Sequence, residues 1–325
     1  MSNIICLPFI VKNGKLLKTT IDSGKFLSES KRGAYTGART IKTKSGEFFV
    51  FNLKQHINRL TNSCQIMIND NFKKIPKNLE NLTNENFLKE EIIKNLKEGF
   101  LNDSTKEDLK LTILITWSNE ESYDLSIHFS KLTENISENV QKSIELIPGS
   151  RQHILAKDSE WVRYRKQIED LRYCKTSNEI VLIDKQGNAN EGLSSNFFVL
   201  MNDNKIYTAN EGIIPGTVRT LILEICKEEK IEVILKSPNL NEIKNWKEIF
   251  IASTSRLLLP IEKLFLHKTE KFFDGIFDEK EKEEEKEKEK IFKNEIEEFK
   301  FSIEFSKKLS KKVKENLLKM SEKIF

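Results

Sequence analysis

The chain has 325 residues, of which 38% are hydrophobic and 32% charged, and its 54 Lys and Arg residues nearly balance its 50 Asp and Glu residues. A chain of this length can form two domains that each bury a hydrophobic core. The formal net charge of +4 is small for that length, and no basic cluster is interleaved with aromatic residues. Composition therefore argues against a nucleic-acid-binding protein.

The four cysteines and four histidines are scattered along the sequence. None of Cys6, Cys64, Cys174 and Cys226 forms a Cys-x-x-Cys pair, which argues against a zinc site and against a secreted disulfide scaffold. Segment 4–11 lacks the basic start and cleavage site of a signal peptide and reads as a strand. No apolar run is long enough to cross a bilayer. We therefore expect a soluble, cytoplasmic protein with no metal and no membrane partner.

Residues 1–130 predict an N-terminal α+β domain. The first 50 residues alternate apolar and polar positions, and Asn13-Gly14 and Ser45-Gly46 are hairpin signals within them. The next expected elements are a helix capped by Asn52, with Gln55 three residues on, a helix through 87–100, and strands at 109–117 and 123–129. This order of strands and helices is typical of a domain in which helices pack on a mainly antiparallel sheet.

A polar, weakly periodic stretch at 131–142 predicts a linker to a second domain at 143–277. The expected elements of that domain are strands at 144–147, 179–184, 197–201, 206–208, 231–235 and 249–253, and helices over 161–173 and from Thr217. Acidic and basic residues alternate at 278–290, which predicts a charged, low-complexity insertion, solvated or disordered. The remaining residues, 291–325, predict a C-terminal helix that docks through its Phe, Ile and Leu side chains.

Three groups with complementary chemistry follow one another in the second domain. Lys157 lies 34 residues before Glu191, which opens the segment Glu-Gly-Leu-Ser-Ser-Asn-Phe-Phe, and Gly216-Thr217 then opens a helix. A lysine amine can bond an aldehyde, a buried carboxylate can keep a pyridine nitrogen protonated, and a helix start can hold phosphate. Their order and spacing resemble the class IV pyridoxal-phosphate aminotransferases. That family includes branched-chain and D-amino-acid aminotransferases and aminodeoxychorismate lyase.

The resemblance covers about residues 30–262. It implies an α+β architecture of fold-type IV: an N-terminal α/β sandwich domain and a C-terminal pseudo-barrel β domain with flanking helices, to which this chain adds a charged helical extension. It also implies pyridoxal 5′-phosphate as cofactor and a homodimer. The implied reaction moves an amino group between an amino acid, of the branched-chain or D type, and a 2-oxo acid through an aldimine on Lys157.

The resemblance also implies a role for each matching residue. Lys157 would bond the cofactor and move the α-proton, and Glu191 would pair with the ring nitrogen. Arg59, in the segment His-Ile-Asn-Arg-Leu, would bind the phosphate, and His56 reads as a structural histidine. The other cofactor-binding candidates are Ser195, Asn196, Gly216, Thr217, Val218, Ser253 and Thr254. Position alone makes Tyr35, Arg39 and Arg256 candidates for substrate binding.

One departure from the family pattern leaves the reaction open. Many of these aminotransferases carry a tyrosine five residues after the lysine, where this chain has Val162, and the lyase branch also carries an apolar residue there. A lyase-like elimination that releases pyruvate is therefore an alternative. A second alternative is a catalytically degenerate homologue that binds partners through its charged extension. The presence of Lys157, Glu191 and Arg59 together argues against this alternative, because random sequence change in an inactive protein would have no physical reason to leave all three in place.

Overall fold

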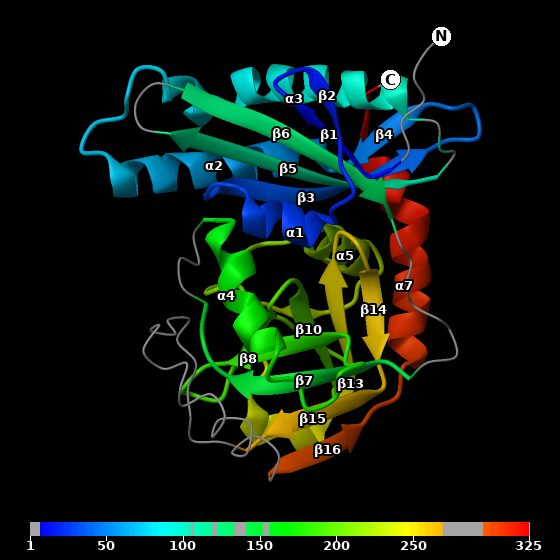
Figure 1. Ribbon diagram of the computed structural model, residues 1–325. Helices are drawn as coiled ribbons and strands as arrows, with labels where there is room; N and C mark the ends of the chain where they lie inside the picture. The colour runs from blue at the N-terminus through cyan, green and yellow to red at the C-terminus, as the bar shows by residue number, and fades with distance from the viewer. Residues whose placement is uncertain are drawn as a thin grey trace. The chain divides into compact units, whose positions relative to one another are not determined.

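The computed structural model describes residues 7–103, 105, 107–118, 122–132, 141–151, 156–268 and 295–324. The chain divides into two compact units (Figure 1). Unit 1 contains Met1–Glu134, Leu155–Arg163 and Asn316–Phe325, and unit 2 contains Asn135–Ile154 and Tyr164–Glu315. The segment that carries Lys157 thus packs with unit 1, although its place in the sequence suggests the second domain. Residues 133–140 of the predicted linker and the charged insertion 278–290 lie outside the described residues.

Unit 1 is built on a seven-stranded antiparallel sheet with the order β17-β4-β3-β5-β6-β1-β2. Its strands are β1 (Phe9–Lys12), β2 (Lys15–Lys18), β3 (Gly33–Lys42), β4 (Phe48–Phe51), β5 (Leu109–Ser118), β6 (Ser122–Lys131) and β17 (Ser321–Lys323). Asn13 and Gly14, with φ angles of 48° and 75°, form the tight turn between β1 and β2, and Gly46 (φ 89°) lies between β3 and β4. Both predicted hairpins are confirmed.

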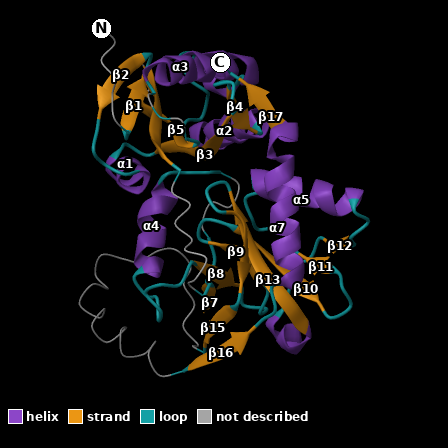
Figure 2. Cartoon of the chain, turned by 90° about the vertical axis from the view of Figure 1, so that its right-hand side faces the viewer, coloured by secondary structure: helices purple, strands orange, loops and turns teal. Residues whose placement is uncertain are grey.

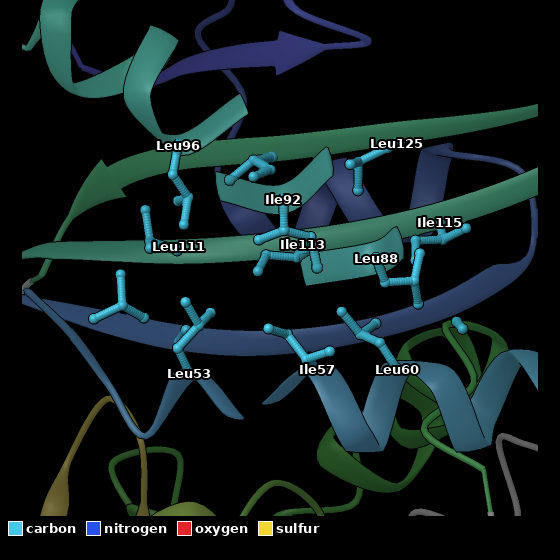
Figure 3. Close-up of a cluster of buried hydrophobic side chains, with 14 of the residues drawn as sticks. Leu53, Ile57, Leu60, Leu88, Ile92, Leu96, Leu111, Ile113, Ile115 and Leu125 are labelled. Carbon is cyan, nitrogen blue, oxygen red and sulfur yellow. The ribbon is translucent and has the colours of Figure 1, made fainter. Parts of the chain in front are cut away.

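Two long helices, α2 (Leu53–Asn71) and α3 (Glu85–Asn102), pack on this sheet, and the short 3₁₀ helix η1 (Glu80–Thr83) precedes α3. Apolar residues three and four positions apart on each helix meet alternate residues of β5. Figure 3 shows these leucines and isoleucines on both helices and on β5. Gly99 of α3 allows the helix to approach β6 closely, because a Cβ atom there would lie 2.1 Å from the ring of Phe129.

The starts of two helices differ from the sequence-based expectation. α2 begins where predicted, but Asn52 has a φ of 48° and does not cap the helix; its Nδ2 donates to Oε1 of Gln55 at 2.8 Å. Helix α1 (Ser23–Glu29) interrupts a stretch that was expected to be β structure. Asp22 starts α1 by accepting hydrogen bonds from the backbone amides of Gly24 and Lys25.

Unit 2 is built on a sheet with the order β12-β11-β10-β9-β8-β7-β15-β16 (Figure 2). β13, paired with β14, joins this sheet at β10. Its strands are β7 (Ser143–Pro148), β8 (Glu179–Ile183), β9 (Ala189–Gly192), β10 (Asn196–Met201), β11 (Ile206–Tyr207), β12 (Val233–Ile234), β13 (Trp246–Ser253), β14 (Leu257–Ile261), β15 (Lys263–His267) and β16 (Ile296–Lys300). β7 runs parallel to β8 and β15, and its Ile144 and Leu146 belong to the core of this unit.

Helices pack on the strands that carry the candidate residues of unit 2. α5 (Thr217–Glu228) packs against β13, and α7 (Glu304–Asn316) contacts β14, where Ser310 donates to the carbonyl of Leu258 at 2.9 Å. Lys312 of α7 pairs with Glu229 at the end of α5. The other helices are α4 (Glu160–Glu169) and the 3₁₀ helix η2 (Leu240–Asn245). Within the described ranges, no helix has both the length and the apolar character required to cross a membrane.

The prediction of one C-terminal helix over 291–325 is wrong. Residues 296–300 form β16, which pairs with β15, and α7 starts only at Glu304. Phe299 and Phe301, two positions apart, pack on the core of unit 2, which is strand periodicity hidden among charged residues. After α7 come the 3₁₀ helix η4 (Leu317–Met320) and β17, which pairs with β4 in unit 1. Helix α4 also ends at Glu169, earlier than the predicted 173.

Candidate active site

In unit 1, the backbone of Lys157 is fixed to both β3 and α2. Its carbonyl accepts a hydrogen bond from the amide of Tyr35 at 2.9 Å, and its own amide donates to Oγ of Ser63 at 2.9 Å. Ser63 in turn donates to the carbonyl of Arg59 at 2.7 Å. A single buried hydroxyl therefore joins the lysine to the helical turn that carries Arg59.

The side chain of Lys157 lies close to an aromatic ring. Its Nζ is 4.8 Å from the ring centroid of Tyr35, a distance typical of cation–π contacts. Val162 stands at the position of the family tyrosine and is buried in a small apolar cluster with Tyr35, Leu114 and Phe26. Position 162 therefore supports the aromatic ring beside the lysine and contributes no hydroxyl of its own.

His56 of α2 lies among the charged residues of unit 1 and is fully buried. Burial lowers its pKa well below the ordinary value, and the positive charges of Arg59 and Lys157 lower it further. Its Nδ1 is 2.8 Å from the hydroxyl of Thr36. A neutral imidazole held beside two cations leaves a net positive local charge, which suits an anionic ligand such as phosphate.

Arg39 shares one face of β3 with Tyr35, because side chains alternate along a strand. It is 3% exposed, and its Nη2 lies 3.7 Å from Oδ2 of Asp108. Arg39 is thus a buried, acid-paired arginine in the same unit as the lysine.

In unit 2, the carboxylate of Glu191 is held from two directions. Glu191, on β9, is 5% exposed, and its Oε2 accepts a hydrogen bond from the amide of Ile214 at 3.0 Å. Its Oε1 lies 3.7 Å from Nη1 of Arg151, which is also buried. The carboxylate is therefore buried and oriented, as a residue that must meet a ring nitrogen needs to be.

Asn196 fixes the segment that leads into α5. Its Nδ2 donates to the carbonyl of Ile214, and its Oδ1 accepts from the amide of Gly216, both at 3.0 Å. A Cβ atom on Gly216 would lie 2.3 Å from that same oxygen, so a side chain does not fit there. Because both ends of the amide bond to protein, Asn196 orients the neighbouring segment rather than offering a donor to a ligand.

The start of α5 offers an anion-binding arrangement. Gly216 precedes the helix in an extended conformation without a side-chain cap, and the first turn contains no acidic residue. The amides of Thr217 and Val218 lie in this turn, where backbone N–H groups lack partners within the helix. The hydroxyl of Thr217 is 3.4 Å from that of Thr254 in the turn between β13 and β14. Two hydroxyls and a helix start thus lie together.

Ser253, Ser195 and Arg256 lie in a hydrogen-bonded network around Glu179. Nη2 of Arg256 is 2.6 Å from Oε2 of Glu179, which also accepts from the hydroxyl of Ser195 at 2.9 Å. Nε of Arg256 donates to Oγ of Ser253 at 3.2 Å. The expected substrate candidate Arg256 is thus engaged by protein groups.

The family follows from comparison with known proteins. A sequence model of the family described as amino-transferase class IV matches residues 38–264. The chain belongs to this family. A D-alanine aminotransferase from Bacillus licheniformis is 30% identical over 122 residues, which make up 34% of this chain and 42% of that protein. The match thus spans less than half the length of the curated relative.

Solved structures of class IV aminotransferases share the fold. A branched-chain aminotransferase from Thermoproteus uzoniensis, determined with norvaline, aligns with a TM-score of 0.67 and 15% identity, covering 98% of this chain and 99% of that one. A branched-chain amino acid aminotransferase from Thermobaculum terrenum in its PLP form aligns with a TM-score of 0.65 and 13% identity, covering 98% of each chain. The predicted α+β architecture of fold-type IV is confirmed.

Sequence reasoning missed four polar residues of this class IV family member: Ser63, Arg151, Glu179 and Ser194. Each acts through a partner far along the chain, as Ser63 does with Lys157, 94 residues away. The two serines and Glu179 belong to common residue types at unremarkable positions, and nothing nearby in the sequence marks them. A cation such as Arg151 could have been expected from the sequence, because a buried carboxylate at Glu191 needs a positively charged partner.

Proposed function

We propose that this chain is a pyridoxal-5′-phosphate-dependent aminotransferase that moves an amino group between an amino acid and a 2-oxo acid. The observation that carries the proposal is the Lys157–Ser63–Arg59 connection in unit 1, in which one hydroxyl joins the backbone of the lysine to the backbone of the arginine. Lys157 would hold the cofactor covalently through its amine, and Arg59 would hold the phosphate electrostatically. The cofactor's two attachment points therefore require two such groups held in a fixed relation.

The residues present fit this cofactor. Beside the amine and guanidinium of unit 1, the buried His56 is kept neutral, so it adds no charge of its own. In unit 2 the start of α5 and the hydroxyls of Thr217 and Thr254 suit the phosphate. The buried Glu191 carboxylate suits a protonated ring nitrogen.

When bound, the cofactor supplies an aldehyde that bonds amines and a ring that withdraws electrons from the substrate α-carbon. Nζ of Lys157 would take the proton from that carbon and deliver it to the product, as a positioned general base and acid. Glu191 holds a proton at the ring nitrogen. In unit 1, Arg59 would bind phosphate. In unit 2, the amides of Thr217 and Val218 and the hydroxyls of Ser253 and Thr254 would bind phosphate, and Ser195, Asn196 and Gly216 would shape their surroundings.

For the substrate, we propose amino acids of the branched-chain or D type. The proposal draws on the relatives, which are named as branched-chain and D-alanine aminotransferases. Tyr35 and Arg39, on one face of β3, are the candidates for substrate contact. We further propose that the protein works in the cytoplasm as a homodimer, without a nucleic-acid or membrane partner.

A lyase that releases pyruvate from aminodeoxychorismate is the second candidate function. Val162 favours it, because this position is apolar and packed against Tyr35 rather than offering a hydroxyl. Two parallel assays distinguish the functions. One incubates the protein with aminodeoxychorismate and measures pyruvate; the other supplies leucine or D-alanine with 2-oxoglutarate and measures glutamate. Glutamate formation without pyruvate release supports the aminotransferase, and the reverse supports the lyase.

The cofactor proposal is tested by reconstitution. Purified protein is mixed with pyridoxal phosphate, and its visible absorbance is followed while single amino acids are added. A band that an amino acid bleaches and a 2-oxo acid restores supports transamination. A protein that acquires no band at saturating cofactor refutes it.

A further inference from the structure

Glu179 is a buried carboxylate that lies next to the candidate cofactor residues of unit 2. It stands at the start of β8 and is 1% exposed. Burial by itself would raise its pKa, but Arg256 and the hydroxyls of Ser194 and Ser195 hold the pKa below the ordinary value. Glu179 is therefore a charged group in the protein interior, fully supplied with donors.

The guanidinium of Arg256 contacts four protein groups. Nη2 contacts Oε2 of Glu179 at 2.6 Å and Oγ of Ser194 at 2.8 Å, and Nη1 donates to the carbonyl of Asn178 at 2.6 Å. Nε donates to Oγ of Ser253 at 3.2 Å. A planar guanidinium fork can reach these groups at once, and an ammonium cannot.

The same carboxylate oxygen of Glu179 also holds the segment that follows Glu191. The hydroxyls of Ser194 and Ser195 donate to Oε2 of Glu179 at 2.7 and 2.9 Å. The packing is tight here, because a Cβ atom on Gly192 would lie 2.4 Å from Oγ of Ser195. One oxygen thus joins the turn after β13 to the segment after β9.

We propose that Glu179 and Arg256 are positioning residues that hold the Ser253-Thr254 turn in place for phosphate binding. The pair anchors Ser253 directly, which keeps the neighbouring Thr254 hydroxyl beside Thr217 at the start of α5. This inference rests on the proposed function. It assigns Arg256 to the phosphate-binding turn, in place of the substrate contact expected from its position in the sequence.

The test compares two ligands that differ only in the phosphate. Pyridoxal phosphate and pyridoxal both carry the aldehyde for Lys157, so the ratio of their dissociation constants isolates the phosphate-binding groups. The ratio is measured by absorbance titration for wild-type protein and for Glu179→Gln, Arg256→Lys and Ser194→Ala. Ser194→Ala is the mildest variant, because Ser194 is exposed and both charges remain.

Glu248→Gln is the matched control. Glu248 is also a buried glutamate of unit 2, it accepts hydrogen bonds from Ser306 and Phe305 at the start of α7, and it lies five residues before Ser253 on β13. Its loss should lower thermal stability without changing the ligand ratio. Thermal unfolding of each apo variant identifies any that fails to fold.

We expect Glu179→Gln to weaken pyridoxal phosphate binding about 10- to 100-fold, by analogy with the loss when hydrogen-bond partners of metal ligands are removed, with pyridoxal binding changed far less. Arg256→Lys should behave similarly and Ser194→Ala more mildly. An unchanged ratio in folded Arg256→Lys and Ser194→Ala overturns the inference, and a raised KM for the amino acid in Arg256→Lys then returns Arg256 to substrate binding. A wild-type protein that binds neither aldehyde refutes the proposed function itself, and this inference with it.

Discussion

Oγ of Ser63 accepts a hydrogen bond from the amide of Lys157 at 2.9 Å, across 94 residues of sequence. Because the same hydroxyl donates to the carbonyl of Arg59, the backbone positions of Lys157 and Arg59 are coupled through one atom. This coupling favours binding of a cofactor that is held at both its aldehyde and its phosphate, because misplacement of either Lys157 or Arg59 would weaken binding at both ends.

Ser63→Ala should lower stability by about 1–3 kcal/mol, because the amide of Lys157 loses its acceptor. It should also slow capture of pyridoxal phosphate by Lys157, which stopped-flow absorbance measures. Thr61→Val is the control, since the hydroxyl of Thr61 bonds only within α2, to the carbonyl of Ile57 at 3.1 Å. Equal capture rates in Ser63→Ala and Thr61→Val would show that the connection to Arg59 has no role in cofactor binding.

Gly216→Ala should weaken both folding and phosphate binding. Its Cβ atom would meet Oδ1 of Asn196 at 2.3 Å, so the segment leading into α5 must shift. We expect a loss of about 1–3 kcal/mol, typical of inserting a methyl group into a packed site. Gly37→Ala is the stability control, because a Cβ atom there meets nothing within 4 Å. Urea unfolding measures the loss of stability in both variants. Similar losses in Gly216→Ala and Gly37→Ala would mean that the contact with Asn196 is not what excludes a side chain at position 216.

Stability should fall as pH drops below about 6.5, and His56 should account for part of that fall. The pKa of His56 in the folded protein is well below the ordinary 6.5. Below pH 6.5 the unfolded chain therefore binds a proton at this histidine that the folded protein does not bind. The contribution of His56 to the free energy of unfolding is therefore fully present above pH 6.5. It is lost as the pH falls, at up to about 1.4 kcal/mol per pH unit. Urea unfolding at pH 7.5 and 5.5 should show a smaller difference for His56→Gln than for wild type. His128, whose pKa is lowered chiefly by burial, contributes in both proteins and does not affect the comparison.

Val162→Tyr should destabilise the protein rather than restore a family feature. Val162 is 7% exposed and packs with Tyr35 and Leu114, so a phenol ring would overfill the cluster and bury its hydroxyl. A loss of about 1–3 kcal/mol is expected, together with a changed environment of Tyr35 beside Lys157. Higher transaminase activity at unchanged thermal stability would contradict this packing argument.

Local sequence signals predicted most elements of both units. Asn13-Gly14 and Gly46 gave correct turns because their positive φ angles are a property of the residues themselves. The helical periodicity of α2, α3 and α5 was equally local. β16 was missed because lysine and glutamate dominate its composition, and only Phe299 and Phe301 reveal the strand once β15 is present to pair with it.

The partners of the candidate residues could not be predicted in the same way. Arg256 and Glu179 are 77 residues apart, and their contact depends on how β8 and the turn after β13 meet in the folded unit. Sequence position suggested a substrate-binding role for Arg256 because its neighbours match the family, but only the fold shows its protein partners. The family pattern thus identifies residues, whereas tertiary pairing determines what each is free to bind.

Covalent attachment to Lys157 tests the central proposal most directly. Protein reconstituted with pyridoxal phosphate is treated with borohydride, digested and analysed by mass spectrometry, with Lys157→Ala as the matched variant. We predict that the cofactor is fixed on Nζ of Lys157 in the wild type and that no lysine of the variant is labelled in its place. Label spread over surface lysines, or equal labelling of the variant, would contradict it.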